Sequence, residues 1–129
     1  MEFSKHKSIY IQIADHFYER VLKRVWVPGE KVPSIRQLAV EMEVNPNTVM
    51  RSYTTLEEKG ILYNQRGIGF FVTDEAPALV SDLLRERFLN EQLPEVFETM
   101  DLLGLPPADL ISLYERWKSS SKTQTKHNT

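Results

Sequence analysis

The sequence contains no cysteine and only three histidines. The absence of cysteine excludes a disulfide framework, a thiolate zinc site and a cysteine nucleophile. His6 and His127 lie near the two ends of the sequence, and His16 stands alone in a helical pattern, so the histidines offer little material for a metal site. We therefore expect neither a metal ion nor another cofactor.

Long apolar runs are also absent. No stretch approaches the roughly 18 residues that a membrane span requires. The first residues, Met1-Glu-Phe-Ser-Lys5, lack the apolar segment and the cleavage site of a signal peptide. We expect a cytoplasmic protein with no membrane partner. Its 41% hydrophobic and 26% charged residues are typical of one globular module with a small appendage.

The signals of an enzyme are missing as well. The sequence shows no cluster of nucleophile, base and orienting residue, no phosphate-binding glycine loop and no metal-ligand spacing. Gly67-Ile-Gly69 stands between two predicted strands, where two glycines suit the tip of a hairpin. The pattern therefore does not predict an enzyme.

The charge balance is slightly acidic, with a net charge of −2, whereas DNA-binding domains are usually basic. The acidic excess lies towards the C-terminus. Residues 1–74 hold ten Lys and Arg against nine Asp and Glu, and the remainder holds six against nine. The stretch from Val44 to Leu56 carries Arg51 and no acidic residue, so phosphates could approach it without meeting a carboxylate.

Three helices are predicted in the first 60 residues. Apolar residues at three- and four-residue spacing predict a helix over Ser8 to Val25, and the prolines and glycine of residues 27–33 predict a turn after it. Ser34-Ile-Arg-Gln37 has the pattern of a capping box that begins a short second helix. Asn45-Pro46 begins a third, which runs to about Lys59 and is closed by Gly60.

A β-hairpin should follow the three helices. Residues 61–65 and 70–73 are rich in β-branched and aromatic side chains, and Arg66-Gly-Ile-Gly69 between them suits a tight tip. Three helices followed by a hairpin are the outline of a winged helix-turn-helix. The fold class is thus mainly α with a small β-hairpin, and residues 1–74 form the predicted DNA-binding domain.

Residues 75–118 are expected to form a short helical dimerisation tail. Pro94 interrupts the pattern and predicts a kink or break near Leu93. A last helix should run from Pro107 to about Lys118, and the Ser/Thr/Lys-rich residues 119–129 should be disordered. The first tail segment carries apolar residues at Leu79, Val80, Leu83, Leu84, Phe88, Leu89, Leu93, Val96, Phe97, Met100 and Leu103.

Two short helices joined by a tight turn also occur in proteins that never bind DNA. The third helix favours DNA, because its N-terminal half presents polar groups and one arginine where base edges would lie in a major groove. Asn47 and Arg51 are the candidate readers. Asn45 has a simpler interpretation as an N-cap that needs no ligand.

Two further positions suit DNA contacts. Ser34 and Arg36 begin the second helix, whose free N–H groups and positive dipole end suit a phosphate, although Arg36 could equally be an ordinary surface arginine. Arg66 at the hairpin tip could enter a minor groove or bind the backbone. Gly67 beside it could serve the turn alone.

The order and spacing of these motifs resemble the DNA-binding domain of the GntR family over about residues 8–74. The motifs are Tyr10-Ile-Gln-Ile13, Pro28-Gly-Glu-Lys-Val-Pro-Ser-Ile-Arg-Gln-Leu-Ala39, Val44-Asn-Pro-Asn-Thr-Val49, Gly60 and Arg66-Gly-Ile-Gly-Phe-Phe-Val72. The Asn-Pro-Asn-Thr form, with a tail of only about fifty residues, is similar to the YtrA subfamily in particular.

This resemblance implies a homodimeric transcription regulator, usually a repressor, that binds an inverted-repeat operator and often controls an adjacent ABC transporter operon and its own gene. By position, Ser34 and Arg36 would contact phosphate or base, and Asn47, Thr48 and Met50 would face the groove. Arg66 and Gly67 would form the wing contact. Met50 departs from the polar or basic residue common in relatives, so readout could shift to Arg51 or to a thymine methyl group.

The tail is too short for the effector-binding domains of larger GntR proteins, and the residues identify no small-molecule effector. Its apolar residues are too many for two helices to bury between themselves, which favours packing against a second subunit. The alternative is that they cover their own winged helix. The acidic balance leaves open one other function, a winged-helix module that binds protein.

Overall fold

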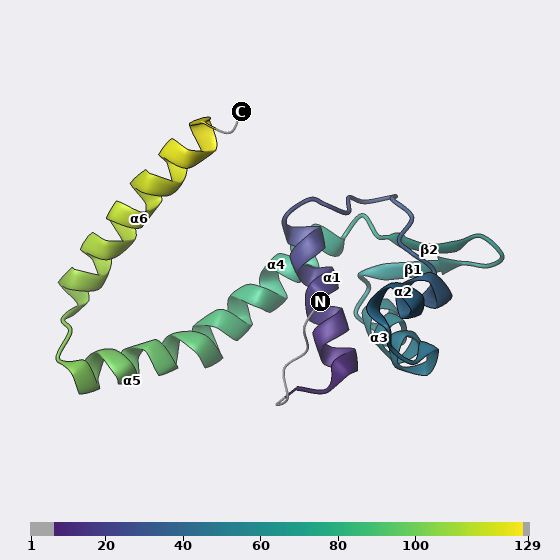
Figure 1. Cartoon of the computed structure of the whole chain (residues 1–129), viewed down its shortest axis with the longest axis horizontal. Helices are drawn as coiled ribbons and strands as arrows, with labels where there is room; N and C mark the ends of the chain where they lie inside the picture. The colour runs from purple at the N-terminus through teal and green to yellow at the C-terminus, as the bar shows by residue number, and fades with distance from the viewer. Residues whose placement is uncertain (1–6, 128–129) are drawn as a thin grey trace. The chain divides into compact units, whose positions relative to one another are not determined.

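The computed structural model describes residues 7–127, with side chains described for residues 7–121. The chain is mainly helical with one two-stranded antiparallel hairpin (Figure 1). It divides into two compact units that meet between Glu86 and Arg87, later than the functional boundary expected after Asp74. Among the helices described, none is both long enough and apolar enough to span a bilayer.

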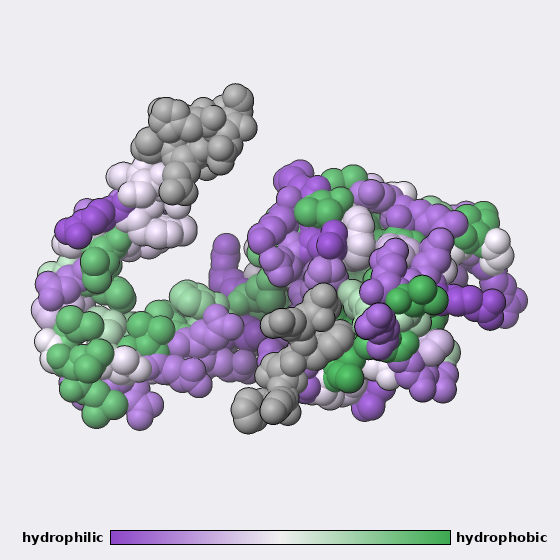
Figure 2. All heavy atoms as spheres, viewed as in Figure 1, coloured by the Kyte–Doolittle hydropathy of each residue, from purple (hydrophilic) through white to green (hydrophobic). Residues whose placement is uncertain are grey.

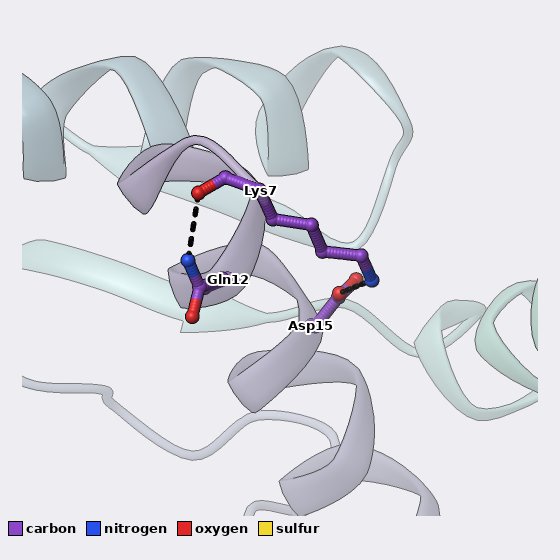
Figure 3. A network of polar contacts seen from close by, with 3 residues as sticks. All are labelled: Lys7, Gln12 and Asp15. Carbon is purple, nitrogen blue, oxygen red and sulfur yellow. Dashed lines mark hydrogen bonds and ion pairs between the residues drawn. The ribbon is translucent and has the colours of Figure 1, made fainter. Parts of the chain in front are cut away.

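Helix α1 spans Ile9–Leu22 and packs its buried face against α3. Ser8 caps it without a side-chain hydrogen bond, and other side chains secure the first turns instead (Figure 3). The Gln12 amide donates to the Lys7 carbonyl at 2.8 Å, and the Lys7 ammonium lies 3.0 Å from the Asp15 carboxylate. These contacts join Lys7 to the first two turns of α1.

Helix α1 ends at Leu22, three residues before the predicted end. Arg24 adopts a left-handed backbone conformation with φ 60°, and the amides of Val25 and Trp26 both donate to the Arg20 carbonyl. The turn brings Trp26 against Phe17, with ring centroids 4.5 Å apart. The apolar spacing continued to Val25, but this tertiary contact ends the helix earlier.

Helices α2 (Ile35–Met42) and α3 (Pro46–Glu58) begin as their caps predict. The Ser34 hydroxyl accepts from the Gln37 amide at 3.1 Å, and the Gln37 side chain accepts from the Ser34 amide at 2.9 Å. The Asn45 side-chain oxygen accepts from the Asn47 amide at 2.8 Å. Gly60 follows α3 with φ 79°, a value that glycine adopts without steric cost.

Strands β1 (Leu62–Gln65) and β2 (Gly69–Val72) form the predicted hairpin, with Leu62 opposite Val72 and Gln65 opposite Gly69. The loop before α2 adds to its other edge. Lys31 forms an isolated antiparallel bridge with Phe71, and the Val32 amide donates to the Phe70 carbonyl at 3.0 Å. The hairpin is therefore attached to the segment that leads into α2.

The core of the first unit is centred on Tyr53 of α3, which is fully buried. Its ring meets Phe17 of α1 and Phe70 of β2 edge-on, with centroids 5.2 and 4.9 Å away. Its hydroxyl donates to the Pro33 carbonyl in the loop before α2. Burial raises the pKa of the Tyr53 hydroxyl, so it remains protonated and keeps this donor role.

Helix α4 (Ala76–Arg87) completes this unit. Ala76 and Val80 are fully buried in the core, and Leu83 and Leu84 pack against it. The first apolar residues of the predicted tail thus cover their own winged helix, which was the alternative to dimerisation for these positions. Leu84 is consequently not a free surface residue.

Pro94 does not break the tail. A π-helical segment, η1 (Phe88–Gln92), leads directly into α5 (Leu93–Leu103), and the backbone of Leu93 stays helical. Proline lacks an N–H and its ring crowds the carbonyl of the preceding turn, so a wider turn just before Pro94 relieves both problems. Gly104, with φ 70°, then ends α5.

Helix α6 spans Pro107–His127, so the expected helix end near Lys118 is wrong. Where disorder was expected from Ser119 onward, the helical backbone of α6 continues to His127. Lys favours helices, Ser and Thr are tolerated in them, and no glycine or proline follows Lys118 to stop the helix. Residues 128–129 lie outside the described residues.

Replacing Tyr53 with Phe should destabilise the winged helix by about 1 kcal/mol, because the ring packing stays while the hydrogen bond to Pro33 is lost. Urea unfolding followed by circular dichroism measures the change. Tyr63→Phe is the matched control, since Tyr63 lies exposed on β1 and should change stability by less than about 0.5 kcal/mol. Equal stability losses in the two variants would contradict the role of the Tyr53 hydroxyl.

Replacing Asn45 with Ala should lower the free energy of unfolding by about 1 kcal/mol, because the Asn47 amide loses its acceptor. Asn45→Asp retains an oxygen at the same place and should keep most of the stability. The same urea titration measures both variants. An Asp variant as unstable as the Ala variant would show that the cap is not what stabilises α3.

Candidate nucleic-acid interface

A shallow hollow lies at the N-terminus of α2. Its volume is about 520 Å³, and its lining includes Lys31, Ser34 and Arg36. Arg36 is exposed in the first turn of α2, and Lys31 enters the hollow from the loop that pairs with β2. Two cations and the positive end of the helix dipole meet here, with one carboxylate, Glu41, also in the lining, and the excess of positive charge suits a phosphate.

Lys31 was not among the residues that the sequence singled out. The sequence pattern indicated a binding role for it only weakly, because one lysine in a turn is usually a solvated surface residue. The structure adds a reason for its position: a Cβ atom on Gly69, whose φ is 142°, would lie 2.7 Å from the Lys31 Cε. The bare backbone of Gly69 therefore leaves room for the Lys31 side chain beside the hairpin.

Residues 46–56 of α3 carry no acidic side chain, whereas Glu57 and Glu58 are exposed at its C-terminal end. Asn47, Met50 and Thr54 are exposed at spacings that put them on one side of the helix, and Thr48 is half-buried beside them. Met50 is 50% exposed. Amide, hydroxyl and thioether groups can hydrogen-bond base edges or contact a thymine methyl group.

Asn45 is engaged within the protein. Its side-chain oxygen accepts from the Asn47 amide at the beginning of α3. The interpretation of Asn45 as an N-cap is therefore confirmed, and a contact between its exposed side chain and DNA stays a prediction.

The Arg51 side chain packs towards α1 rather than extending from the face that carries Asn47 and Met50. Its guanidinium carbon lies 3.8 Å from the centroid of the Tyr10 ring, on α1. Arg51 is exposed and Tyr10 is half-buried. The structure thus places the one cation of α3 on the side of the helix that borders α1.

The hairpin tip projects Arg66, Gly67 and Ile68, all of them exposed. Gly67 has φ 77°, so the turn itself requires a residue that tolerates the left-handed region. Tyr63 and Phe71 stack across the two strands below the tip, with centroids 5.5 Å apart. This aromatic pair stiffens the hairpin and leaves Arg66 at its end.

Buried hydrogen bonds fix these elements relative to one another. The Ser52 hydroxyl of α3 donates to the Tyr10 carbonyl of α1 at 2.7 Å, and the Tyr53 hydroxyl donates to Pro33 before α2. The Thr73 hydroxyl after β2 donates to the Gly60 carbonyl at 2.5 Å. The α2 hollow, the α3 face and the hairpin are therefore parts of one rigid frame.

One titratable cluster lies away from these surfaces, at the end of α1. The Arg20 Nε donates to the His16 Nε2 at 2.7 Å, and its guanidinium lies over Trp26. Burial, and then the charge of Arg20, lower the pKa of His16. Across the residues with described side chains, no group of three histidine or acidic residues is placed to hold a metal ion.

Comparison with known proteins identifies the first unit. Residues 9–72 match the model of the gntR family of bacterial regulatory proteins. The chain is 43% identical over 113 residues to the HTH-type transcriptional repressor YtrA of Bacillus subtilis, covering 88% of this chain and 84% of that protein. It is 36% identical over 110 residues to the HTH-type transcriptional regulator YhcF of the same organism, covering 85% and 89%.

The fold comparison extends through the tail. The crystal structure of a GntR-family regulator from Bacteroides thetaiotaomicron aligns with a TM-score of 0.73 and 36% identity, covering 88% of this chain and 99% of that one. The winged helix-turn-helix fold class is thereby confirmed. The chain belongs to the gntR family of bacterial regulatory proteins and is a DNA-binding transcriptional regulator rather than an enzyme.

Proposed function

We propose that this protein is a repressor that binds an inverted-repeat operator as a homodimer, one winged helix on each half-site. The observation that carries the proposal is the charge pattern of the first unit. The part of α3 over residues 46–56, which carries no acidic side chain, lies in the same rigid frame as Lys31 and Arg36 at α2 and Arg66 at the hairpin tip. Cations that bind phosphates on either side of a polar reading helix are typical of this motif.

Each element has a distinct task in this proposal. The N-terminal half of α3 enters the major groove, where Asn47, Thr48 and Met50 contact base edges. Ser34 and Arg36 bind a phosphate at the N-terminus of α2, together with Lys31. Arg66 and Gly67 contact the backbone or the minor groove beside the half-site.

The role of repressor is supported by the name of the relative YtrA, a transcriptional repressor that is 43% identical over 88% of this chain. As in the subfamily that the sequence resembles, we propose that the regulated genes are an adjacent ABC transporter operon and the protein's own gene, in the bacterial cytoplasm. The promoter of its own gene is therefore the first DNA to test.

The second unit supplies the proposed dimer contact. Its helices expose large apolar side chains, many of them green in Figure 2 along α5 and the first turns of α6. An apolar groove of about 650 Å³ lies within this unit, between residues of η1 and α5 and residues of α6. The most exposed members of this surface are Phe97, Leu102, Leu103, Ile111, Tyr114 and Trp117. A soluble monomer rarely exposes so much contiguous apolar surface, which favours burial against a second copy.

Arg36→Ala and Arg66→Ala should each weaken binding to the promoter duplex and reduce the slope of log affinity against log salt by about 0.9, the value for one lost phosphate contact. Fluorescence anisotropy with a labelled duplex measures both. Arg85→Ala, an exposed arginine of α4, is the matched control and should bind like the unaltered protein. Salt-independent binding, or no binding at low salt, would favour the protein-binding module instead.

Phe88→Glu should convert the dimer to a monomer, because a carboxylate in an apolar interface loses its hydration without gaining a partner. Light scattering after size exclusion measures the mass. Asn90→Glu is the control, because it introduces the same charge at an exposed polar position of the same π-helical segment, and this variant should remain dimeric. Leu84 is avoided because it packs on its own core. A Phe88→Glu protein that stays dimeric and folded would exclude this interface.

A further inference from the structure

The contact between Arg51 and Tyr10 is not explained by packing of the core. Arg51 is exposed, and within the described residues no carboxylate or carbonyl accepts a hydrogen bond from its guanidinium. Its guanidinium carbon lies over the Tyr10 ring, 3.8 Å from the ring centroid, within the range of a cation–π interaction. The stack therefore holds the only cation of α3 in a defined place while its N–H donors stay available.

The Tyr10 ring is itself held in place. The buried Ser52 hydroxyl donates to the Tyr10 backbone carbonyl at 2.7 Å. Ser52 and Arg51 are neighbours on α3, so adjacent residues of α3 contact the backbone and the ring of the same tyrosine. Tyr10 is thus a fixed platform at the junction of α1 and α3 rather than a mobile surface residue.

The stack changes the role that the sequence suggested for Arg51. A base reader would extend from the exposed face of α3 with Asn47 and Met50, whereas Arg51 turns towards α1. An arginine stacked through its face still presents N–H donors along its edge, which is the geometry that matches a phosphate. Holding the side chain beforehand also reduces the rotamer entropy that binding would otherwise cost.

We propose that Tyr10 is a positioning residue that holds Arg51 at the α1 edge of the reading helix, where its guanidinium binds a DNA phosphate. The inference rests on the proposed function and adds a contact on the α1 side of α3. Arg51 then contributes affinity that is independent of sequence, and Asn47 and Met50 are left to read bases.

A double-mutant cycle tests the proposal, using the full chain and two duplexes, its own promoter and an unrelated sequence. Tyr10→Leu removes the ring and should weaken binding to both duplexes by the same factor, about 3- to 10-fold, as expected for loss of a cation–π contact. Tyr10→Phe keeps the ring and should bind like the unaltered protein. Arg51→Ala should weaken both duplexes and lower the salt slope by about 1.

The decisive comparison is made in the Arg51→Ala background. There Tyr10→Leu should cause no further loss of affinity, because the side chain that it positions is gone. Thermal unfolding of each variant checks that the protein remains folded at the assay temperature.

Four results would overturn the proposal. Tyr10→Leu could weaken binding equally with and without Arg51, which would assign Tyr10 a structural role only. The loss in Arg51→Ala could be confined to the promoter and to one base pair, which would make Arg51 a base reader. Tyr10→Leu could bind like the unaltered protein while that protein binds its promoter, in which case this inference fails and the proposed function stands. An unaltered protein that binds neither duplex at low salt would overturn both.

Discussion

The buried side chain of Tyr53 is the contact on which the arrangement of the winged helix depends. Its ring touches α1 through Phe17 and β2 through Phe70, and its hydroxyl binds the loop that leads into α2. One residue of α3 therefore fixes the position of α3 relative to every other element that the proposed interface uses. Because an aromatic ring resists both compression and rotation in a packed core, these distances vary little.

This rigidity explains how a chain with a net negative charge can present a surface for DNA. The protein does not rely on a general excess of lysine and arginine. It places a few cations at fixed sites, at α2, at the border of α1 and α3, and at the hairpin tip, and residues 46–56 of α3 carry no acidic group. Local potential, rather than net charge, then decides where a phosphate can approach.

Local signals in the sequence predicted the first unit well. The capping box at Ser34 and the cap at Asn45 act within one helical turn, so they could be recognised without knowledge of the fold. The sequence could not predict contacts that the fold creates between distant residues. The Tyr10–Arg51 stack and the packing of Trp26 that ends α1 early belong to this class.

The tail was predicted less well for a related reason. A proline and a change of composition are local signals of disruption, but neither determines how a helix accommodates them. The chain widens one turn before Pro94 and continues, and α6 extends through a segment that composition alone assigned to disorder. The first half of α4 packs on the core of its own winged helix. Whether these apolar residues pack there or against a second subunit depends on the shape of that core.

The close approach of Gly69 to Lys31 has a consequence for how this surface can vary. Any side chain at residue 69 would have to displace the lysine, since the first added carbon would meet it at 2.7 Å. The glycine in the hairpin and the cation beside α2 thus form a pair, although they are separated by the whole reading helix. A larger residue at this strand position would have to move the end of the lysine side chain and would also adopt a φ of 142°, which L side chains rarely do, so the glycine is favoured by its backbone as well as by its neighbour.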